Sequence, residues 1–252
     1  MNPREAIERF HLVFLRHFAA AVSPGTVCLK GGVNLRLFLN SPRVSEDIDF
    51  DARVVGVEIL KKNVNKVLTS RPLISELAAA GISLSEIKPA KQTQTVQRWK
   101  FHVVLDANPL PTRLEFSRRN DEPFENCVTE PPSLALLADH KVPLFVFNHY
   151  AAEAAYRQKV NALATRTQVQ ARDVFDLHHL SGYGAPRDLP PQLVIQAIEQ
   201  LALVSFDMYW DQVIPFLPVD LAMHYGTPAA WNAMFAKVRN DLSAAAVRPG
   251  TP

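Results

Sequence analysis

Apolar residues in the first half of the chain recur first at helical spacing and then at strand spacing. Apolar positions three to four residues apart predict helices at residues 3–22, 33–39 and 57–77. In the third of these helices, Ile59 is expected on the inner face. Alternating apolar and polar positions predict strands at residues 47–51, 82–87, 96–105 and 112–117. The turn-rich segment between the last two strands predicts an antiparallel hairpin.

Strand-like alternation disappears in the second half of the chain. Residues 120–132 are rich in acids and prolines, so we expect the chain to cross there between two lobes. Proline-bounded apolar patterns predict helices at residues 133–140, 149–165, 170–181, 190–203, 206–214 and 228–246. The predicted fold class is therefore α+β, with a mixed or antiparallel sheet lobe at residues 1–130 and an all-helical lobe at 131–252.

Composition and charge describe an ordinary soluble globular protein. Of the 252 residues, 48% are hydrophobic and 21% are charged, and the net charge of +2 requires any nucleic-acid surface to be local. Cys28 and Cys127 lie far apart without metal-type spacing, which predicts two reduced thiols. Charges interrupt the apolar N-terminal segment, so neither a signal peptide nor a membrane partner is expected, and the predicted location is cytoplasmic.

Candidate chemistry begins at two adjacent glycines, Gly31 and Gly32. Glycine lets the backbone approach a ligand closely, and the following helix would direct free N–H groups towards a phosphate. In a strand, Asp47, Asp49 and Asp51 would share one face, because residues two apart point the same way. Carboxylates that close repel each other, and a divalent cation is the usual means of keeping them ionised.

The strings LKGGVNLRLF (29–38) and RVSEDIDFD (43–51) resemble the AbiEii/AbiGii toxin family, within the nucleotidyltransferase superfamily that has a polymerase-beta-like fold. Fourteen residues separate Gly32 from Asp47, slightly more than is general in that superfamily, which indicates a longer loop around residues 40–43. The resemblance covers residues 25–52 and 112–182. It implies a nucleotidyltransferase-like sheet lobe and a helical lobe that closes a nucleotide cleft.

The resemblance also implies a metal site. Glu115, between two apolar residues of the last predicted strand, would complete a Mg²⁺ site with Asp47 and Asp49. The alternative is a surface glutamate paired with Arg113 or Arg118. Ser45 could bond a phosphate or only stabilise a turn, and Arg36 is interpreted as a cation on a helix surface.

A second cluster lies in the predicted helical lobe. Lys159 and Arg166 are seven residues apart, so both emerge on one face of a helix, and Asp173 and Asp176 share another. Such patterns are usually solvated faces or structural ion pairs. The cluster nevertheless resembles the family's K…R…RDxxDL signature, which implies that Lys159 and Arg166 bind the nucleotide and that Asp173 or Asp176 has an accessory catalytic role.

The function implied by the resemblance is Mg²⁺-dependent transfer of an NMP from an NTP to an acceptor. Gly31, Gly32, Ser45, Lys159 and Arg166 would bind the NTP. By family analogy the acceptor is an RNA 3′ end, such as that of tRNA, and the enzyme is a toxin restrained by a cognate antitoxin. Two alternatives stay open: a nucleotidyltransferase that modifies a protein side chain, and a non-catalytic nucleotide- or partner-binding module.

Overall fold

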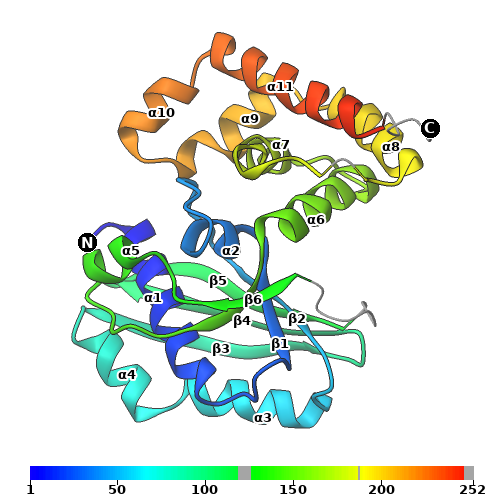
Figure 1. Ribbon diagram of the computed structural model, residues 1–252. Helices are drawn as coiled ribbons and strands as arrows, with labels where there is room; N and C mark the ends of the chain where they lie inside the picture. Colours follow the sequence, from blue (N-terminus) through cyan, green and yellow to red (C-terminus); the bar gives the residue numbers. More distant parts are fainter. Residues whose placement is uncertain (119–125, 187, 247–252) are drawn as a thin grey trace. The chain divides into compact units, whose positions relative to one another are not determined.

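The computed structural model describes residues 1–118, 126–186 and 188–246 (Figure 1). Two compact units account for the chain. The sheet unit comprises Met1–Asn40 and Val44–Tyr150, and the helical unit comprises Ser41–Arg43 and the chain from Ala151 onward. The boundary expected at residue 130 therefore differs from this division, because the segment after it returns to the sheet as a strand.

The sheet unit is built on one seven-stranded mixed sheet with the order β3-β4-β5-β2-β1-β7-β6. Its strands are β1 (Val27–Lys30), β2 (Ile48–Ala52), β3 (Ile82–Gln92), β4 (Val96–Leu105), β5 (Asn108–Ser117), β6 (Cys127–Glu130) and β7 (Phe147–Tyr150). Strand β2 runs parallel to β5, and β1 runs parallel to β7, while the other neighbours are antiparallel. The predicted α+β class and the β4–β5 hairpin are confirmed.

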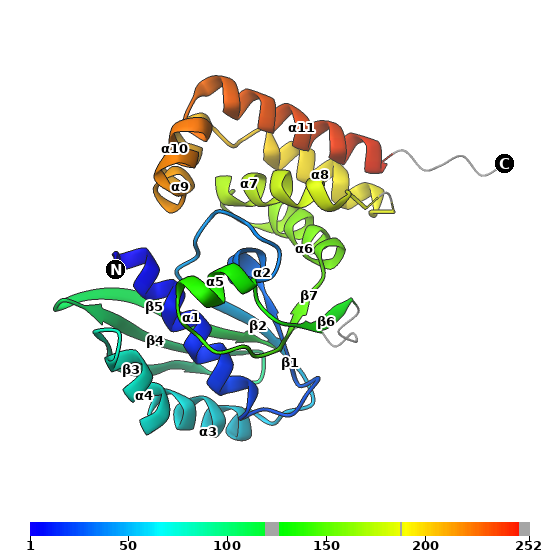
Figure 2. The ribbon, with the colours of Figure 1, turned by 60° about the vertical axis from the view of Figure 1, so that its left-hand side comes forward.

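Helices α1 (Pro3–Ala19), α3 (Val57–Leu68) and α4 (Arg71–Ala78) cover one face of this sheet (Figures 1 and 2). Helix α1 begins with a capping box, in which Asn2 and Glu5 each accept a hydrogen bond from the other's backbone N–H. Its buried aromatic stripe, Phe10, Phe14 and Phe18, packs with rings from the strands and forms the centre of the core. Two short helices, α2 (Gly31–Leu37) and α5 (Leu134–Asp139), complete the unit.

The single helix expected at residues 57–77 is wrong, because the structure has two helices there. Helix α3 ends at Leu68, and the hydroxyl of Ser70 accepts a hydrogen bond from the backbone N–H of Leu73 at the start of α4. A proline in the first turn of α4 strengthens this new N-terminus. The expected inner position of Ile59 is also wrong, since its side chain is 60% exposed.

The helical unit contains the helices α6 (Ala152–Thr165), α7 (Ala171–Leu180), α8 (Pro191–Leu201), α9 (Phe206–Gln212), α10 (Val219–Tyr225) and α11 (Pro228–Ala246). The sequence pattern anticipated each of them except α10, and it also read β7 as the start of a helix. Helix α10 has only seven residues, and a segment of two turns carries little periodicity. Among the described residues, no helix is long and apolar enough to span a bilayer.

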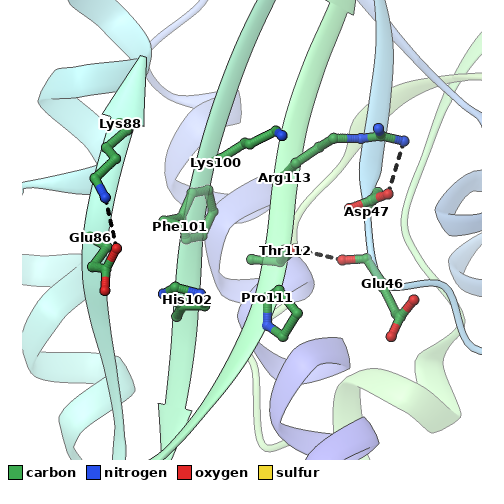
Figure 3. Close-up of a pocket in the computed structure, with 10 residues that line it drawn as sticks. All are labelled: Glu46, Asp47, Glu86, Lys88, Lys100, Phe101, His102, Pro111, Thr112 and Arg113. Atoms are coloured by element: carbon green, nitrogen blue, oxygen red, sulfur yellow. Dashed lines mark hydrogen bonds and ion pairs between the residues drawn. The ribbon is translucent and has the colours of Figure 1, made fainter. Parts of the chain in front are cut away.

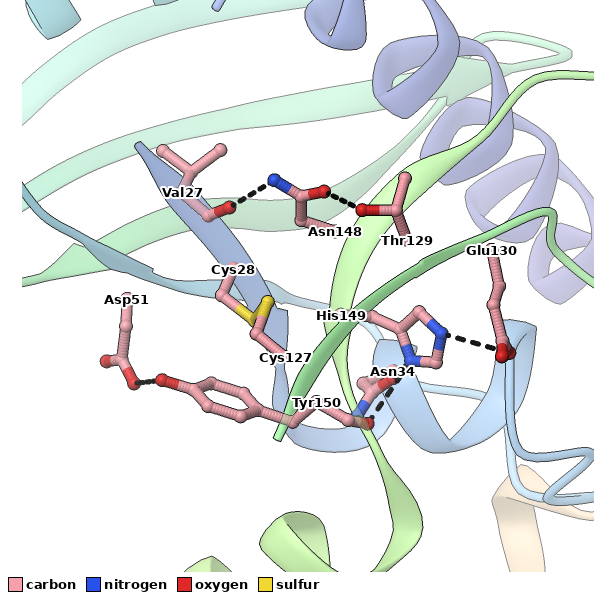
Figure 4. Close-up of a disulfide and its surroundings, with 10 residues drawn as sticks. All are labelled: Val27, Cys28, Asn34, Asp51, Cys127, Thr129, Glu130, Asn148, His149 and Tyr150. Atoms are coloured by element: carbon pink, nitrogen blue, oxygen red, sulfur yellow. Dashed lines mark hydrogen bonds and ion pairs between the residues drawn. A yellow bond between two sulfur atoms is a disulfide. The ribbon is translucent and has the colours of Figure 1, made fainter. Parts of the chain in front are cut away.

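The expectation of two reduced thiols is wrong, because Cys28 and Cys127 form a disulfide (Figure 4). They belong to β1 and β6, the strands on either side of β7, and their Cα atoms are 6.6 Å apart. Their sequence separation of 99 residues gave no sign of this proximity. A disulfide is unusual in the expected cytoplasmic location, where thiols are kept reduced.

We predict that Phe50→Ala lowers the free energy of unfolding by about 3–5 kcal/mol, because a large fully buried side chain is lost. The Phe50 ring stacks on that of Phe116 at 4.6 Å, and Phe50 is 0% exposed. Urea-induced unfolding measures the change. Ile59→Ala is the matched control, and the exposure of its side chain predicts a change within about 0.5 kcal/mol.

Candidate functional site

A row of charged residues crosses the sheet unit at one level of the strand register. Lys30 on β1 lies opposite Asp49 on β2, Asp49 lies opposite Glu115 on β5, and Glu115 lies opposite Arg98 on β4. The predicted neighbourhood of Asp49 and Glu115 is therefore found in the structure. Side chains at paired positions of neighbouring strands point to the same face, so the two carboxylates lie next to each other.

Two arginines hold the acids of this site. The Arg98 guanidinium donates to Glu115 with a shortest N–O distance of 2.6 Å, and Arg113 pairs with Asp47 at 2.9 Å (Figure 3). Asp47 lies immediately before β2 rather than in it. The alternative interpretation paired Glu115 with Arg113 or Arg118, but its partner is Arg98. Arg113 pairs with Asp47, and Arg118 donates to a glutamine side chain and a backbone carbonyl.

Asp49 is the acid with the most perturbed environment. Burial raises its pKa above the usual value for Asp, and the neighbouring carboxylates of Asp47 and Glu115 raise it further, whereas Arg113 and Lys30 act in the opposite direction. The three candidate acids are therefore close enough to repel one another.

Asp51 lies two residues after Asp49 on β2, as expected, but its side chain is buried. It forms an ion pair with Lys30 and accepts a hydrogen bond of 2.8 Å from the hydroxyl of Tyr150 (Figure 4). Burial and the adjacent carboxylate raise the pKa of Tyr150 above its usual value, so its hydroxyl stays protonated and donates. Asp51 thus ties β2 to β1 and β7 instead of joining the acids of the candidate site.

Gly31 makes room for Asp49. Gly31 and Gly32 are the first two residues of α2, and Gly31 has a φ of +71°. A Cβ atom at Gly31 would lie 3.0 Å from Oδ2 of Asp49, so a larger residue would press directly on this carboxylate. Ser45 stabilises the turn before β2, because its hydroxyl donates to the carbonyl of Asp47 at 3.3 Å.

The donor chemistry of this site suits a hard divalent cation, since Mg²⁺ prefers carboxylate oxygens. Across the described ranges, no three His, Cys, Asp or Glu side chains are arranged so as to hold a metal ion. Arg98 and Arg113 occupy oxygens of Glu115 and Asp47 in this structure. A cation that replaced them would meet three carboxylates, and two of these, Asp47 and Glu115, raise the pKa of the third, Asp49.

The second predicted cluster is an ion network within the helical unit. Lys159 of α6 donates to Asp173 at 2.8 Å and pairs with Asp176 at 2.7 Å, and both acids lie on α7. Arg166 donates to the other oxygen of Asp173 at 2.8 Å. Arg43 holds Asp176 with two hydrogen bonds of 3.0 and 3.1 Å. The structure therefore brings together all four predicted residues of this cluster.

The carboxylates and the ammonium of this network are almost completely buried. Both carboxylates are 0% exposed, and the Lys159 side chain is 11% exposed. Burial favours the neutral form of Asp176, but Arg43 and Lys159 hold its pKa well below the usual range. Burial likewise opposes the charge of Lys159, yet Asp173 and Asp176 more than offset this effect, so its pKa is raised. The ammonium is thus charged, fixed and largely enclosed.

Sequence reasoning missed the two arginines that complete these clusters. Arg43 lies in the loop that was expected only to be long, and the strand position of Arg98 showed no partner in the sequence. Arg36 was interpreted as a surface cation, but it pairs with the buried carboxylate of Glu8. Burial disfavours the ionised form of Glu8, but hydrogen bonds from His140 and Arg36 outweigh burial and lower the pKa of Glu8 to about 2.

Comparisons with known proteins identify a family from the sequence and similar folds among solved structures. The family model described as nucleotidyl transferase AbiEii toxin, type IV TA system, matches residues 13–248. The structure is similar to MenT4, a nucleotidyltransferase toxin from Mycobacterium tuberculosis H37Rv, at 18% identity with a TM-score of 0.65, covering 96% of this chain and 86% of MenT4. It is also similar to JHP933 from Helicobacter pylori, at 18% identity with a TM-score of 0.59, covering 96% and 94% of the two chains. A search of curated proteins gives no match.

We predict that Gly31→Ala lowers activity more than stability alone explains. Its Cβ would displace the Asp49 carboxylate, whereas Gly25→Ala introduces a Cβ at a similar φ of +77° with nothing within 4 Å. Both variants should lose about 1–2 kcal/mol from the left-handed backbone conformation. Only Gly31→Ala should lose turnover in assays held below both unfolding transitions, and equal activity in the two variants would contradict the proximity of Gly31 to the site.

Asp176→Asn is predicted to lower the free energy of unfolding by about 3–5 kcal/mol, because two buried cations lose a partner. Since the folded-state pKa of Asp176 is lowered, its contribution is present at neutral pH and is lost as the pH falls below 3.8, the usual value for Asp. Urea unfolding at several pH values measures both effects. Asp241→Asn removes an i,i+4 helix ion pair instead and should cost about 0.3–0.5 kcal/mol.

Proposed function

The chain belongs to the AbiEii family of nucleotidyltransferase toxins from type IV toxin–antitoxin systems, and from this premise we propose that it transfers an NMP from an NTP to an RNA 3′ end, such as that of tRNA. The observation that carries the proposal is the register of the sheet, which sets Asp49 opposite Glu115, with Asp47 next to them. Nucleotide transfer needs several carboxylate oxygens in a small space.

Asp47, Asp49 and Glu115 would hold Mg²⁺ in this proposal. Bound Mg²⁺ supplies a Lewis acid that polarises the α-phosphate of the NTP. The residues of the chain prepare this site beforehand, because Gly31 leaves space beside Asp49 and two arginines form ion pairs with Asp47 and Glu115. The acceptor hydroxyl then attacks the α-phosphorus, and the bond to the leaving pyrophosphate breaks.

Lys159 and Arg166 are proposed to bind the triphosphate, together with the backbone at Gly31 and Gly32 and the hydroxyl of Ser45. Asp173 and Asp176 are better suited to positioning than to proton transfer. Both accept from Lys159, and the lowered pKa of Asp176 keeps it ionised throughout the neutral range. Their accessory role in this proposal is to fix the position of the Lys159 ammonium.

A toxin of this family implies a cognate antitoxin, which we propose as the protein partner of the chain. A tRNA acceptor would place its action in the cytoplasm. The alternative acceptor, a protein side chain, would use the same acids and the same leaving group, so it is an outcome of the assay described next.

We predict that Asp49→Asn reduces nucleotide transfer about a thousandfold or more, because the substitution removes a charge from the reaction centre. Purified protein with Mg²⁺ and each α-³²P-labelled NTP is incubated with total RNA and, separately, with total protein. Label should enter RNA with the wild type. The metal-free Asp49→Asn variant should also have a higher unfolding midpoint at pH 7, since a group whose pKa is raised by folding destabilises the fold once it is ionised.

Asp106→Asn is the matched control. Asp106 lies at the β4–β5 turn with a φ of +48°, a conformation that Asn also tolerates, and its side chain is exposed. It should transfer label at the wild-type rate. Wild-type turnover by Asp49→Asn would overturn the metal-site assignment, and label in protein alone would replace RNA with a polypeptide acceptor.

A further inference from the structure

The open face of strands β3, β4 and β5 carries a row of cations that leads to the candidate site. Lys88 on β3 lies opposite Lys100 on β4, and Lys100 lies opposite Arg113 on β5. Arg113 in turn pairs with Asp47. Neighbouring strands are about 4.8 Å apart, so this line from Lys88 to Asp47 extends over about 15 Å. Figure 3 shows these residues on adjacent strands, on the side away from α1.

A groove of about 430 Å³ follows this row. Its lining includes the cations Lys88, Lys100 and Arg113, and also the acids Glu46, Asp47 and Glu86. Trp99 and Val103, which alternate with Lys100 and His102 along β4, are buried in the core. The groove is therefore part of the sheet surface, and it lies wholly within the sheet unit.

The register of these cations works against the stability of the sheet. Like charges directly opposite each other on neighbouring strands are unfavourable, and Lys100 faces one on each side. Glu86 neutralises Lys88 at 2.7 Å, and Asp47 neutralises Arg113 at 2.9 Å. Lys100 is exposed and has no hydrogen bond or ion pair with any residue that the structure describes.

We propose that this cationic row binds the phosphodiester backbone of the acceptor RNA and leads its 3′ end to the acids of the sheet. The inference rests on the proposed function, to which it adds an acceptor-binding surface. An extended row suits a chain of phosphates spaced along a strand, and an uncompensated lysine at its centre supplies charge complementarity. If Asp47 binds a metal ion instead of Arg113, Arg113 loses its counter-charge and the row becomes more positive. Binding of the metal ion and binding of the acceptor RNA therefore strengthen each other.

Three single variants test the row by fluorescence anisotropy with fluorescein-labelled tRNA over a range of salt concentrations. Lys100→Gln should weaken binding and reduce the slope of log affinity against log salt by about 0.7, the value for one phosphate contact on a single strand. Glu86→Gln should strengthen binding, because it releases Lys88 and removes a negative charge from the groove. Lys62→Gln, at an exposed position of α3 on the covered face, should bind as the wild type does.

Thermal unfolding and NTP binding separate this role from others. Lys100→Gln should unfold at or above the wild-type temperature, because it removes two like-charge contacts. A lower midpoint would assign Lys100 a structural role and overturn the inference. Equal losses of NTP and tRNA affinity would assign the groove to the triphosphate and would also overturn it.

The failure of this inference can be distinguished from failure of the proposed function. If the wild type labels RNA while Lys100→Gln and Glu86→Gln bind tRNA with unchanged affinity and slope, only the acceptor surface is wrong. If the wild type labels protein and not RNA, the proposed acceptor is wrong, and the surface loses its ligand with it.

Discussion

The burial of Asp49 beside other carboxylates is the constraint to which the neighbouring charges of the sheet unit respond. Parallel pairing of β2 with β5 sets the two carboxylates side by side, and Asp47 adds a third negative charge. The surrounding sequence compensates for this cost through Arg98, Arg113 and Lys30, which approach from other strands or the end of β1. The acids are thus held near one another by the counter-ions around them, and such a concentration of like charge is unfavourable for stability.

In the helical unit, the charge that needs compensation is a cation, the ammonium of Lys159. Lys159 would be unfavourable in a nearly enclosed position without Asp173 and Asp176, and these acids would be unfavourable without Arg43 and Arg166. Each charge is satisfied, so the Lys159 ammonium has one defined position. Residues 41–43, although they precede β2 in the sequence, cluster with this unit. The loop between the glycines and the acids is therefore long for a structural reason, because it carries Arg43 to Asp176.

The sequence was most informative where a pattern is local. Alternation identified β2, β4 and β5, and the resemblance to the superfamily's apolar–acid–apolar pattern on a late strand favoured Glu115 as a partner of Asp47 and Asp49. Helical spacing identified α1, α7 and α11 in the same way. The partners of these residues are matters of tertiary register. Neither Arg98 beside Glu115 nor Arg43 beside Asp176 can be inferred from spacing, and the disulfide joins strands 99 residues apart. The short strand β7 was missed because four residues carry too little periodicity.

The ion pairs of the site also change how a motif should be read. Carboxylates in such a motif are commonly interpreted either as metal ligands or as structural partners of arginine, as though one role excluded the other. Asp47 and Glu115 are paired with arginines, yet both are near Asp49, whose pKa is raised first by burial and then further by these two carboxylates. An arginine keeps its charge and has a flexible side chain, so it can pair with an acid and still be displaced. Pairing with Arg98 and Arg113 is therefore compatible with a role of these acids as ligands of a divalent cation.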